Sequence, residues 1–221
     1  MEASYIKTER NLTRGAKVVS ALFTPFSIPF LAFLILFLFS YLSMLPLLYK
    51  LIVLGIVFTF TILIPALSIF LFRIVNRLTA QEMGQRKRRY VPFLLTIISY
   101  LFCLLLMQRM NMPWYMTGII LAALLMMTVC VVLNFWWKLS EHMAGAGAII
   151  GGLVAFSNLF GYNPVGWLCL FILTAGVLGT ARITLRHHTL GEVTGGVIVG
   201  VLSVLLVLHP ASNMLFRVFL F

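Results

Sequence analysis

The segment from Thr180 to Gly196 places two histidines, two arginines and a glutamate between two strongly apolar stretches. Within it, His188 and Glu192 are four residues apart, so on one helix they would share a face. The carboxylate would then hold one ring nitrogen of the imidazole while the other nitrogen faces a substrate. The spacing predicts a histidine oriented for chemistry.

A second polar cluster contains Ser140 and His142, and Arg182 precedes His188 by six residues. Two histidines that face one phosphate allow a division of labour. A neutral imidazole attacks phosphorus, and a protonated one gives its proton to the leaving oxygen. Arginine adds a planar fork of donors that fits phosphate oxygens.

The elements that must position these residues are membrane-spanning helices. Of the 221 residues, 62% are hydrophobic and 10% are charged, and several apolar runs reach the ~20 residues that cross a bilayer core of ~30 Å. Backbone groups in lipid must be satisfied within the segment, so we expect an all-α, polytopic transmembrane bundle. The candidate spans are 20–41, 46–75, 91–109, 114–137, 142–159, 165–181 and 190–208.

The span count is six to seven because the first run contains Pro25 and Pro29, which favour irregular first turns. We expect one integral-membrane domain over 1–221, with a basic N-terminal segment at 1–19 and the motifs within 86–205. Alternate spans run in the same direction. The polar segments that precede the third, fifth and seventh runs would therefore meet at one membrane face, at helix N-termini that favour an anion such as phosphate.

The acidic residues limit the possible chemistry, because all five are glutamate and the chain has no aspartate. Hard cations such as magnesium need several oxygen ligands placed together, so we expect no metal and no other cofactor. Cys103, Cys130 and Cys169 lie in apolar runs and show neither a disulfide framework nor metal-ligand spacing. The net charge of +11 suggests anionic lipid head groups as partners, and not nucleic acid. The basic run at 86–89 also fits a topology signal alone.

The motifs "SEH" at 140–142 and "RITLRHHTLGE" at 182–192 resemble the second and third signatures of the type 2 phosphatidic acid phosphatase superfamily. The resemblance covers about residues 86–205 and implies a metal-independent phosphatase that acts on lipid phosphates through a phosphohistidine intermediate. It implies that His188 is the nucleophile, Glu192 its orienting carboxylate and His142 the general acid. The residues that it implies for phosphate binding are Arg182, Ser140, Lys138, Arg86, Lys87 and Arg89.

The chain differs from the usual signatures at Ala181, Glu192 and Glu141, where the superfamily has serine, aspartate and glycine. The first signature is only approximate around Arg86–Arg89 and Pro92. These differences indicate a divergent branch whose lipid substrate stays open: phosphatidic acid, phosphatidylglycerol phosphate, a polyprenyl diphosphate or the phosphates of lipid A.

Two glycine pairs, Gly147 with Gly151 and Gly196 with Gly200, lie in the apolar runs that begin with the proposed catalytic histidines. Small residues four apart let membrane helices approach closely. We expect these two helices to pack together and to fix the distance between His142 and His188.

Two alternative functions come from other classes. One is a non-catalytic protein that binds or transports anionic lipids, and the other is a haem protein with paired histidine ligands. The expected location is the cytoplasmic membrane of a bacterium. Most basic residues share the face of the motifs, which favours a cytoplasmic site, whereas many bacterial members of the superfamily place this site on the outer face.

Overall fold

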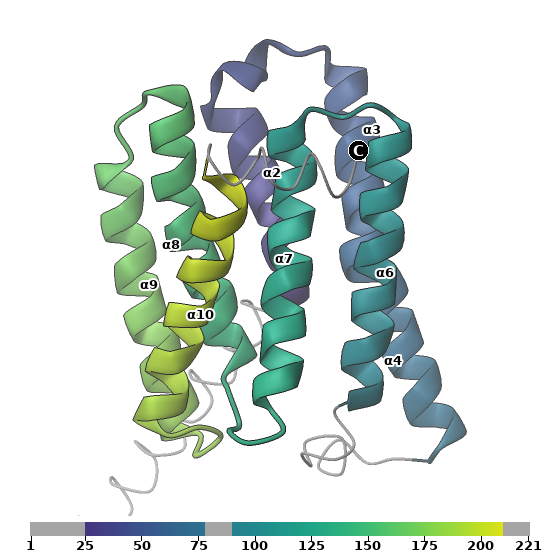
Figure 1. Cartoon of the computed structure of the whole chain (residues 1–221), viewed down its shortest axis with the longest axis vertical. Coiled ribbons are helices and arrows are strands. Elements are labelled where there is room, and N and C mark those ends of the chain that lie inside the picture. Colours follow the sequence, from purple (N-terminus) through teal and green to yellow (C-terminus); the bar gives the residue numbers. More distant parts are fainter. Residues whose placement is uncertain (1–24, 78–89, 210–221) are drawn as a thin grey trace, which may run out of the picture.

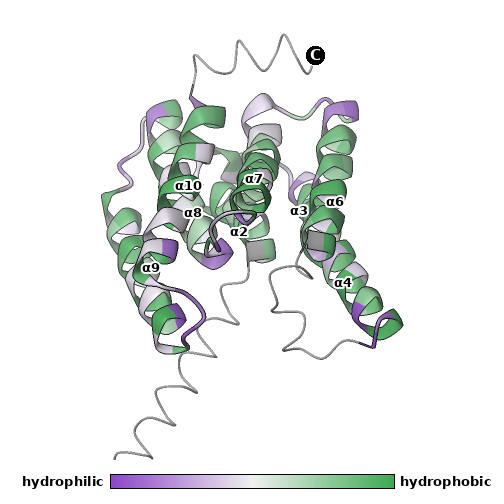
Figure 2. Ribbon diagram, turned by 60° about the horizontal axis from the view of Figure 1, so that its bottom comes forward, coloured by the Kyte–Doolittle hydropathy of each residue, from purple (hydrophilic) through white to green (hydrophobic). Residues whose placement is uncertain are grey.

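The computed structural model of this chain describes residues 25–77 and 90–209, and over these ranges it contains helices and no strand (Figure 1). The prediction of an all-α bundle is confirmed. Hydrophobic residues cover the bodies of the helices, and hydrophilic residues gather at their ends and in the connections (Figure 2). Six helices in the described ranges are long and apolar enough to cross a membrane: the continuous helix Leu47–Val75, α6 (Tyr90–Arg109), α7 (Trp114–Leu133), α8 (Glu141–Phe160), α9 (Val165–Thr184) and α10 (Leu190–Leu208).

The first apolar run is shorter than the predicted span 20–41 over the part that the structure describes. It forms a 3-10 turn, η1 (Pro25–Ser27), then α2 (Ile28–Phe39) and a second 3-10 turn, η2 (Tyr41–Met44). Proline is best tolerated in the first turn of a helix, and Pro29 lies in the first turn of α2. Twelve helical residues extend about 18 Å, which is less than the hydrocarbon thickness.

Two other predicted ends were wrong by a few residues: α9 ends at Thr184 and not at 181, and α7 ends at Leu133 and not at 137. Asn134 caps the helix through its N–H, which bonds to the carbonyl of Cys130. Asparagine and the three aromatic residues that follow are weak helix formers. The chain therefore leaves the helix before Lys138, and it reaches α8 at the N-cap Ser140, whose backbone is extended.

The helix Leu47–Val75 consists of α3 (Leu47–Phe58), a π-helical turn η3 (Thr59–Leu63) and α4 (Ile64–Val75). Pro65 has no N–H, so it cannot serve the carbonyl of Phe60 in the wider π-helical register. The hydroxyl of Ser99 on α6 donates to that carbonyl instead, at 2.5 Å. This bond ties α6 to the irregular point of the long helix.

Helices α8 and α10 approach each other backbone to backbone. A Cβ on Gly196 would lie 2.6 Å from the Ser140 carbonyl oxygen, and one on Gly200 would overlap the carbonyl oxygen of Ala144. From α8, a Cβ on Gly147 would overlap the carbonyl oxygen of Val197, and one on Gly151 would lie 2.9 Å from that of Val201. The predicted close packing of these two helices is confirmed.

Helices α6, α8 and α10 all begin at the same end of the bundle, the lower end in Figure 1. The α7–α8 and α9–α10 connections lie at this end, so the residues around Ser140 and around His188 share one face, as predicted. Arg86, Lys87 and Arg89 lie outside the described residues.

Candidate active site

The connection between α9 and α10 begins with a capping motif at the C-terminus of α9, in which one residue has a left-handed backbone conformation. The N–H of His187 bonds to the carbonyl of Arg182 at 3.2 Å, and the N–H of Arg186 to that of Ile183 at 2.8 Å. This is the Schellman pattern, in which the residue after the C-cap has positive φ. Arg186 occupies that position with φ of 53°, so the chain turns sharply just before His188.

A capping box fixes the other end of the connection. Thr189 is the N-cap of α10: its hydroxyl accepts from the N–H of Glu192 at 3.4 Å, and its own N–H donates to Glu192 Oε2 at 3.1 Å. The sequence "TLGE" has the T-x-x-E pattern of this motif. Thr189 is a positioning residue that the reasoning from spacing missed and that this pattern would have found.

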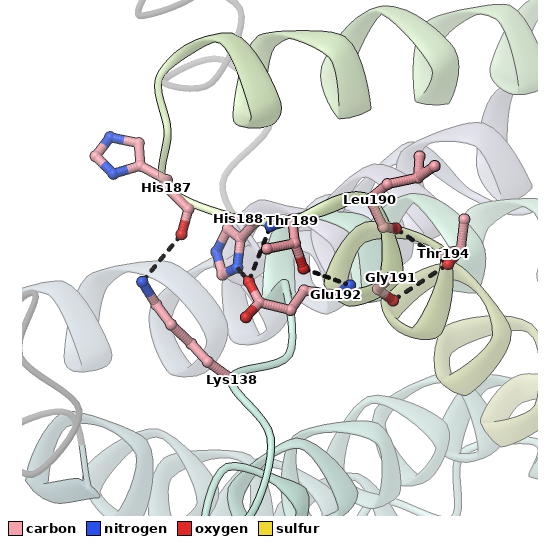
Figure 3. Close-up of polar contacts among 8 residues, drawn as sticks. All are labelled: Lys138, His187, His188, Thr189, Leu190, Gly191, Glu192 and Thr194. Carbon is pink, nitrogen blue, oxygen red and sulfur yellow. Dashed lines mark hydrogen bonds and ion pairs between the residues drawn. The ribbon is translucent and has the colours of Figure 1, made fainter.

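His188 and Glu192 make the predicted contact, with 2.9 Å between Nδ1 and Oε2 (Figure 3). The reason given for it was wrong, because His188 precedes the helix and shares no helical face with Glu192. The carboxylate instead turns back across the N-cap to reach the ring. An ionised carboxylate only accepts hydrogen bonds, so Nδ1 must carry the proton and the lone pair of a neutral ring lies on Nε2.

The surroundings of His188 favour the neutral ring. The residue is buried, with 6% of its surface exposed, and this burial is the main cause that lowers its pKa from 6.5 to about 4. The hydrogen bond that the ring donates to Glu192 opposes this shift, whereas the positive charges of Arg182 and Lys138 add to it. Two cations therefore lie close to an imidazole that is unprotonated at neutral pH.

Ser140 joins the start of α8 to the first turn of α10. Its N–H bonds to the Glu192 carbonyl at 3.3 Å, and its side chain is fully buried. Within the described part of the chain, the Ser140 hydroxyl has no hydrogen-bond partner. A buried polar group without a partner costs free energy and marks a position where a further polar group fits.

Lys138 approaches the same connection from the α7–α8 segment. Its Nζ donates to the His187 carbonyl at 2.9 Å, while the His187 side chain points away from the cluster (Figure 3). Nζ has two further protons for an anion. His142 is the second residue of α8 and is partly buried, two positions after Ser140.

Trp137 borders this cluster and was not among the predicted residues. A Cβ on Gly195 would lie 2.8 Å from the Trp137 ring, and one on Gly191 would lie 3.4 Å from it. The ring thus lies across the first turns of α10, next to Glu192. Tryptophan at a helix end is typical of the membrane interface, which is the only sequence signal for this residue.

Over residues 25–77 and 90–209, no group of three or more His, Cys, Asp or Glu side chains is arranged to hold a metal ion. Comparisons of the chain with protein-family models, curated proteins and solved structures give no match.

Proposed function

We propose that this protein is an integral-membrane phosphatase that hydrolyses a lipid phosphate or polyprenyl diphosphate, without a metal, through a phosphohistidine at His188. The observation that carries the proposal is the state of that side chain. His188 is a buried imidazole whose Nδ1 lies 2.9 Å from Glu192 Oε2. Its burial and the positive charges of Arg182 and Lys138 lower its pKa, which favours the neutral ring. Neutral nitrogen nucleophiles next to cations suit an attack on an anionic phosphate.

In the first step, the lone pair of His188 Nε2 forms a bond to phosphorus as the bond from phosphorus to the lipid oxygen breaks. Protonated His142 gives its proton to that oxygen, so the lipid leaves as a neutral alcohol, or as a lipid phosphate if the substrate is a diphosphate. In the second step, water attacks the phosphohistidine and His142 takes a proton from it. Inorganic phosphate leaves, and both histidines return to their starting states.

The other residues bind the phosphate or orient the nucleophile. Arg182, Lys138 and Ser140 supply donors for phosphate oxygens, with Arg86, Lys87 and Arg89 as further cations in the proposal. Glu192 stabilises the positive charge that develops on the ring during attack, and the Thr189 N–H holds the carboxylate in place. The carboxylate thus acts through His188 and does not touch the substrate.

The test is phosphate release by the purified protein in detergent, with chelator present, from phosphatidic acid, phosphatidylglycerol phosphate, a polyprenyl diphosphate and lipid A. We expect release from at least one of these, background release by His188→Ala and His142→Ala, and a severe loss by Arg182→Ala. Rapid quenching should leave one phosphoryl group on the peptide that contains His188. Activity that chelation abolishes and magnesium restores would overturn the mechanism. If the protein binds these lipids without releasing phosphate, and His188→Ala binds them equally well, a lipid-binding or transport protein would be favoured. A Soret band in the purified protein would favour a haem protein.

We also propose the bacterial cytoplasmic membrane as the location, with the site on the cytoplasmic face. Among the described residues, most of the lysines and arginines lie at the site end of the bundle: Arg73, Arg77, Lys138, Arg182 and Arg186. Arg186 is exposed next to the site and is suited to a labelling test. In a background without the three natural cysteines, Arg186→Cys should react with an impermeant thiol reagent only after the cells are permeabilised. Labelling of intact cells would place the site outside.

A further inference from the structure

A cavity that the proposed phosphatase chemistry does not use extends from the middle of the bundle toward the end away from His188. Its volume is ≈290 Å³, and α2, α7, α8 and α10 supply most of its walls. Characteristic wall residues are Ile35, Ala123, Met126, Gly152 and Phe156. The volume is close to the lower end of the range for ligand pockets in proteins, about 300 Å³.

The cavity and the candidate active site occupy different depths of the bundle. On α10, Val204 is the first lining residue, and it lies fourteen residues after Leu190, or about 21 Å along the helix. On α8 the lining begins at Ala148 and ends at Phe156, a length of about 12 Å. On α2 and its C-cap the lining runs from Ile28 to Ser40, about 18 Å. The lining length is therefore comparable with one leaflet, whose share of the hydrocarbon core is about 15 Å.

The wall chemistry is that of a site for hydrocarbon. Among the described residues that line the cavity none is charged, and the polar residues Ser40, Tyr162 and Asn163 belong to segments at the end of the bundle opposite to His188. Two of them have local partners: Ser40 Oγ donates to the Leu36 carbonyl at 2.5 Å, and Asn163 Oδ1 accepts from the Val165 N–H at 3.0 Å. Because these three residues are uncharged, we expect this end of the cavity not to select lipids by the charge of the head group.

Empty apolar space of this size destabilises a folded protein. Apolar cavities exclude water but take up apolar molecules, and unfilled space costs the lining atoms their dispersion contacts. In a bilayer, hydrocarbon chains are available at this depth. We propose that the cavity binds one acyl chain of a bilayer phospholipid from the leaflet opposite to the His188 end, independently of the charge of the head group. This site is separate from the phosphatase site and does not rest on the proposed function.

Two matched substitutions test the proposal. A Cβ on Gly152 meets only Val204 Cγ1, at 4.0 Å, so Gly152→Leu places a side chain in the cavity without backbone overlap. Gly176 on α9 is exposed, with nothing within 4 Å of an added Cβ. Gly176→Leu therefore adds the same atoms on the lipid-facing surface. Ala123→Phe fills the cavity from α7 and replaces Gly152→Leu if that variant does not fold.

The measurement is photo-crosslinking in phosphatidylcholine vesicles that contain a phosphatidylcholine with a diazirine in the middle of one acyl chain. Mass spectrometry then maps the labelled residues. We expect the unchanged protein and Gly176→Leu to carry label within 119–126 or 148–156, and the cavity-filling variant to lose most of it while keeping its thermal unfolding midpoint. The same experiment with a phosphatidylglycerol probe should give similar labelling.

Absence of label from these two segments in the unchanged protein would overturn the proposal, and so would equal labelling of them in the filled variant. Strong preference for one head group would overturn the independence from head-group charge. None of these outcomes depends on phosphate release, so failure here and failure of the phosphatase proposal are distinguishable.

Discussion

Helices α8 and α10 meet in two different ways along their length. Toward the site end, Gly196 and Gly200 lie against the backbone of α8, and the Ser140 N–H bonds to the Glu192 carbonyl. Toward the other end, Val204 and Leu208 of α10 border the cavity together with Gly152. The same pair of helices thus changes from glycine contacts to larger side chains around a void. Close backbone contact fixes the positions of polar groups, whereas the void leaves space for an apolar molecule.

The largest expected effect concerns the polar end and the role of Glu192. Glu192→Gln removes the negative charge that stabilises the developing imidazolium, so phosphate release should fall about 10²- to 10⁴-fold. Glu192→Asp keeps the charge with a shorter side chain and should lose less. The two variants are compared by their phosphate release in chelator, and their thermal unfolding midpoints show whether both remain folded. Equal losses in the two variants would show that charge at this position is unimportant.

The next effect tests the close contact itself. Gly200→Ala places a Cβ on the carbonyl oxygen of Ala144, and backbone cannot move as easily as a side chain. We expect a loss of about 1–3 kcal/mol in the free energy of unfolding, with reduced phosphate release. Gly176→Ala, where the added Cβ meets nothing within 4 Å, is the matched control. If both variants unfold at the same temperature, α8 and α10 do not need the close approach.

The burial of His188 makes stability depend on pH. Its pKa is about 4 in the folded protein and near 6.5 when unfolded, so the unfolded state binds more protons between these values. The stabilisation is complete above pH 6.5 and is lost as the pH falls toward 4, by at most about 3 kcal/mol. Unfolding midpoints at pH 7.5 and pH 5 measure it. His188→Asn should show a smaller decrease, and an unchanged decrease would assign the effect to other groups.

The same pKa constrains catalysis. Because the nucleophile must be neutral, the acid limb of the kcat/KM profile should lie well below pH 6.5. Deprotonation of the general acid His142 should set the alkaline limb, so the profile is bell-shaped. In His142→Ala the alkaline limb should disappear with a substrate whose leaving group needs no proton. An acid limb near the ordinary histidine value would contradict the burial of His188.

The smallest effect concerns the turn before His188. Arg186 has a left-handed conformation, which glycine adopts without strain, so Arg186→Gly should stabilise the protein by up to about 1 kcal/mol. Thr184→Gly, in the last helical turn of α9, should destabilise it by a similar amount. Thermal unfolding midpoints of the two variants show whether each substitution stabilises or destabilises the protein. A loss of stability in both would mean that the Arg186 side chain contributes more than its backbone conformation costs.

Much of the fold follows from the sequence, because a long apolar segment in a bilayer can satisfy its backbone hydrogen bonds within itself only as a helix. The glycine contacts of Gly147 and Gly196 also followed from spacing. The pairing of His188 with Glu192 was predicted for a reason that the structure corrects, since capping by Thr189 makes the contact. Helix ends were less predictable: at Asn134, a run of weak helix formers ended α7 earlier than hydropathy indicated. The cavity has no sequence signature, because most of its walls come from ordinary apolar residues on four helices.

The long helix Leu47–Val75 has a consequence for the kind of bilayer that suits this protein. Lys50 lies in its first turn, where Nζ bonds to the Ser43 carbonyl at 2.9 Å, and Arg73 lies in its last turn. The roughly 22 uncharged residues between them extend about 33 Å, which matches a hydrocarbon core of ~30 Å with a small tilt. In a markedly thinner bilayer this helix would have to tilt further, and the Ser99 bond to its π-helical turn would carry that tilt to α6. Hydrophobic mismatch should therefore act first on the α3–α4–α6 side of the molecule and last on the α8–α10 pair.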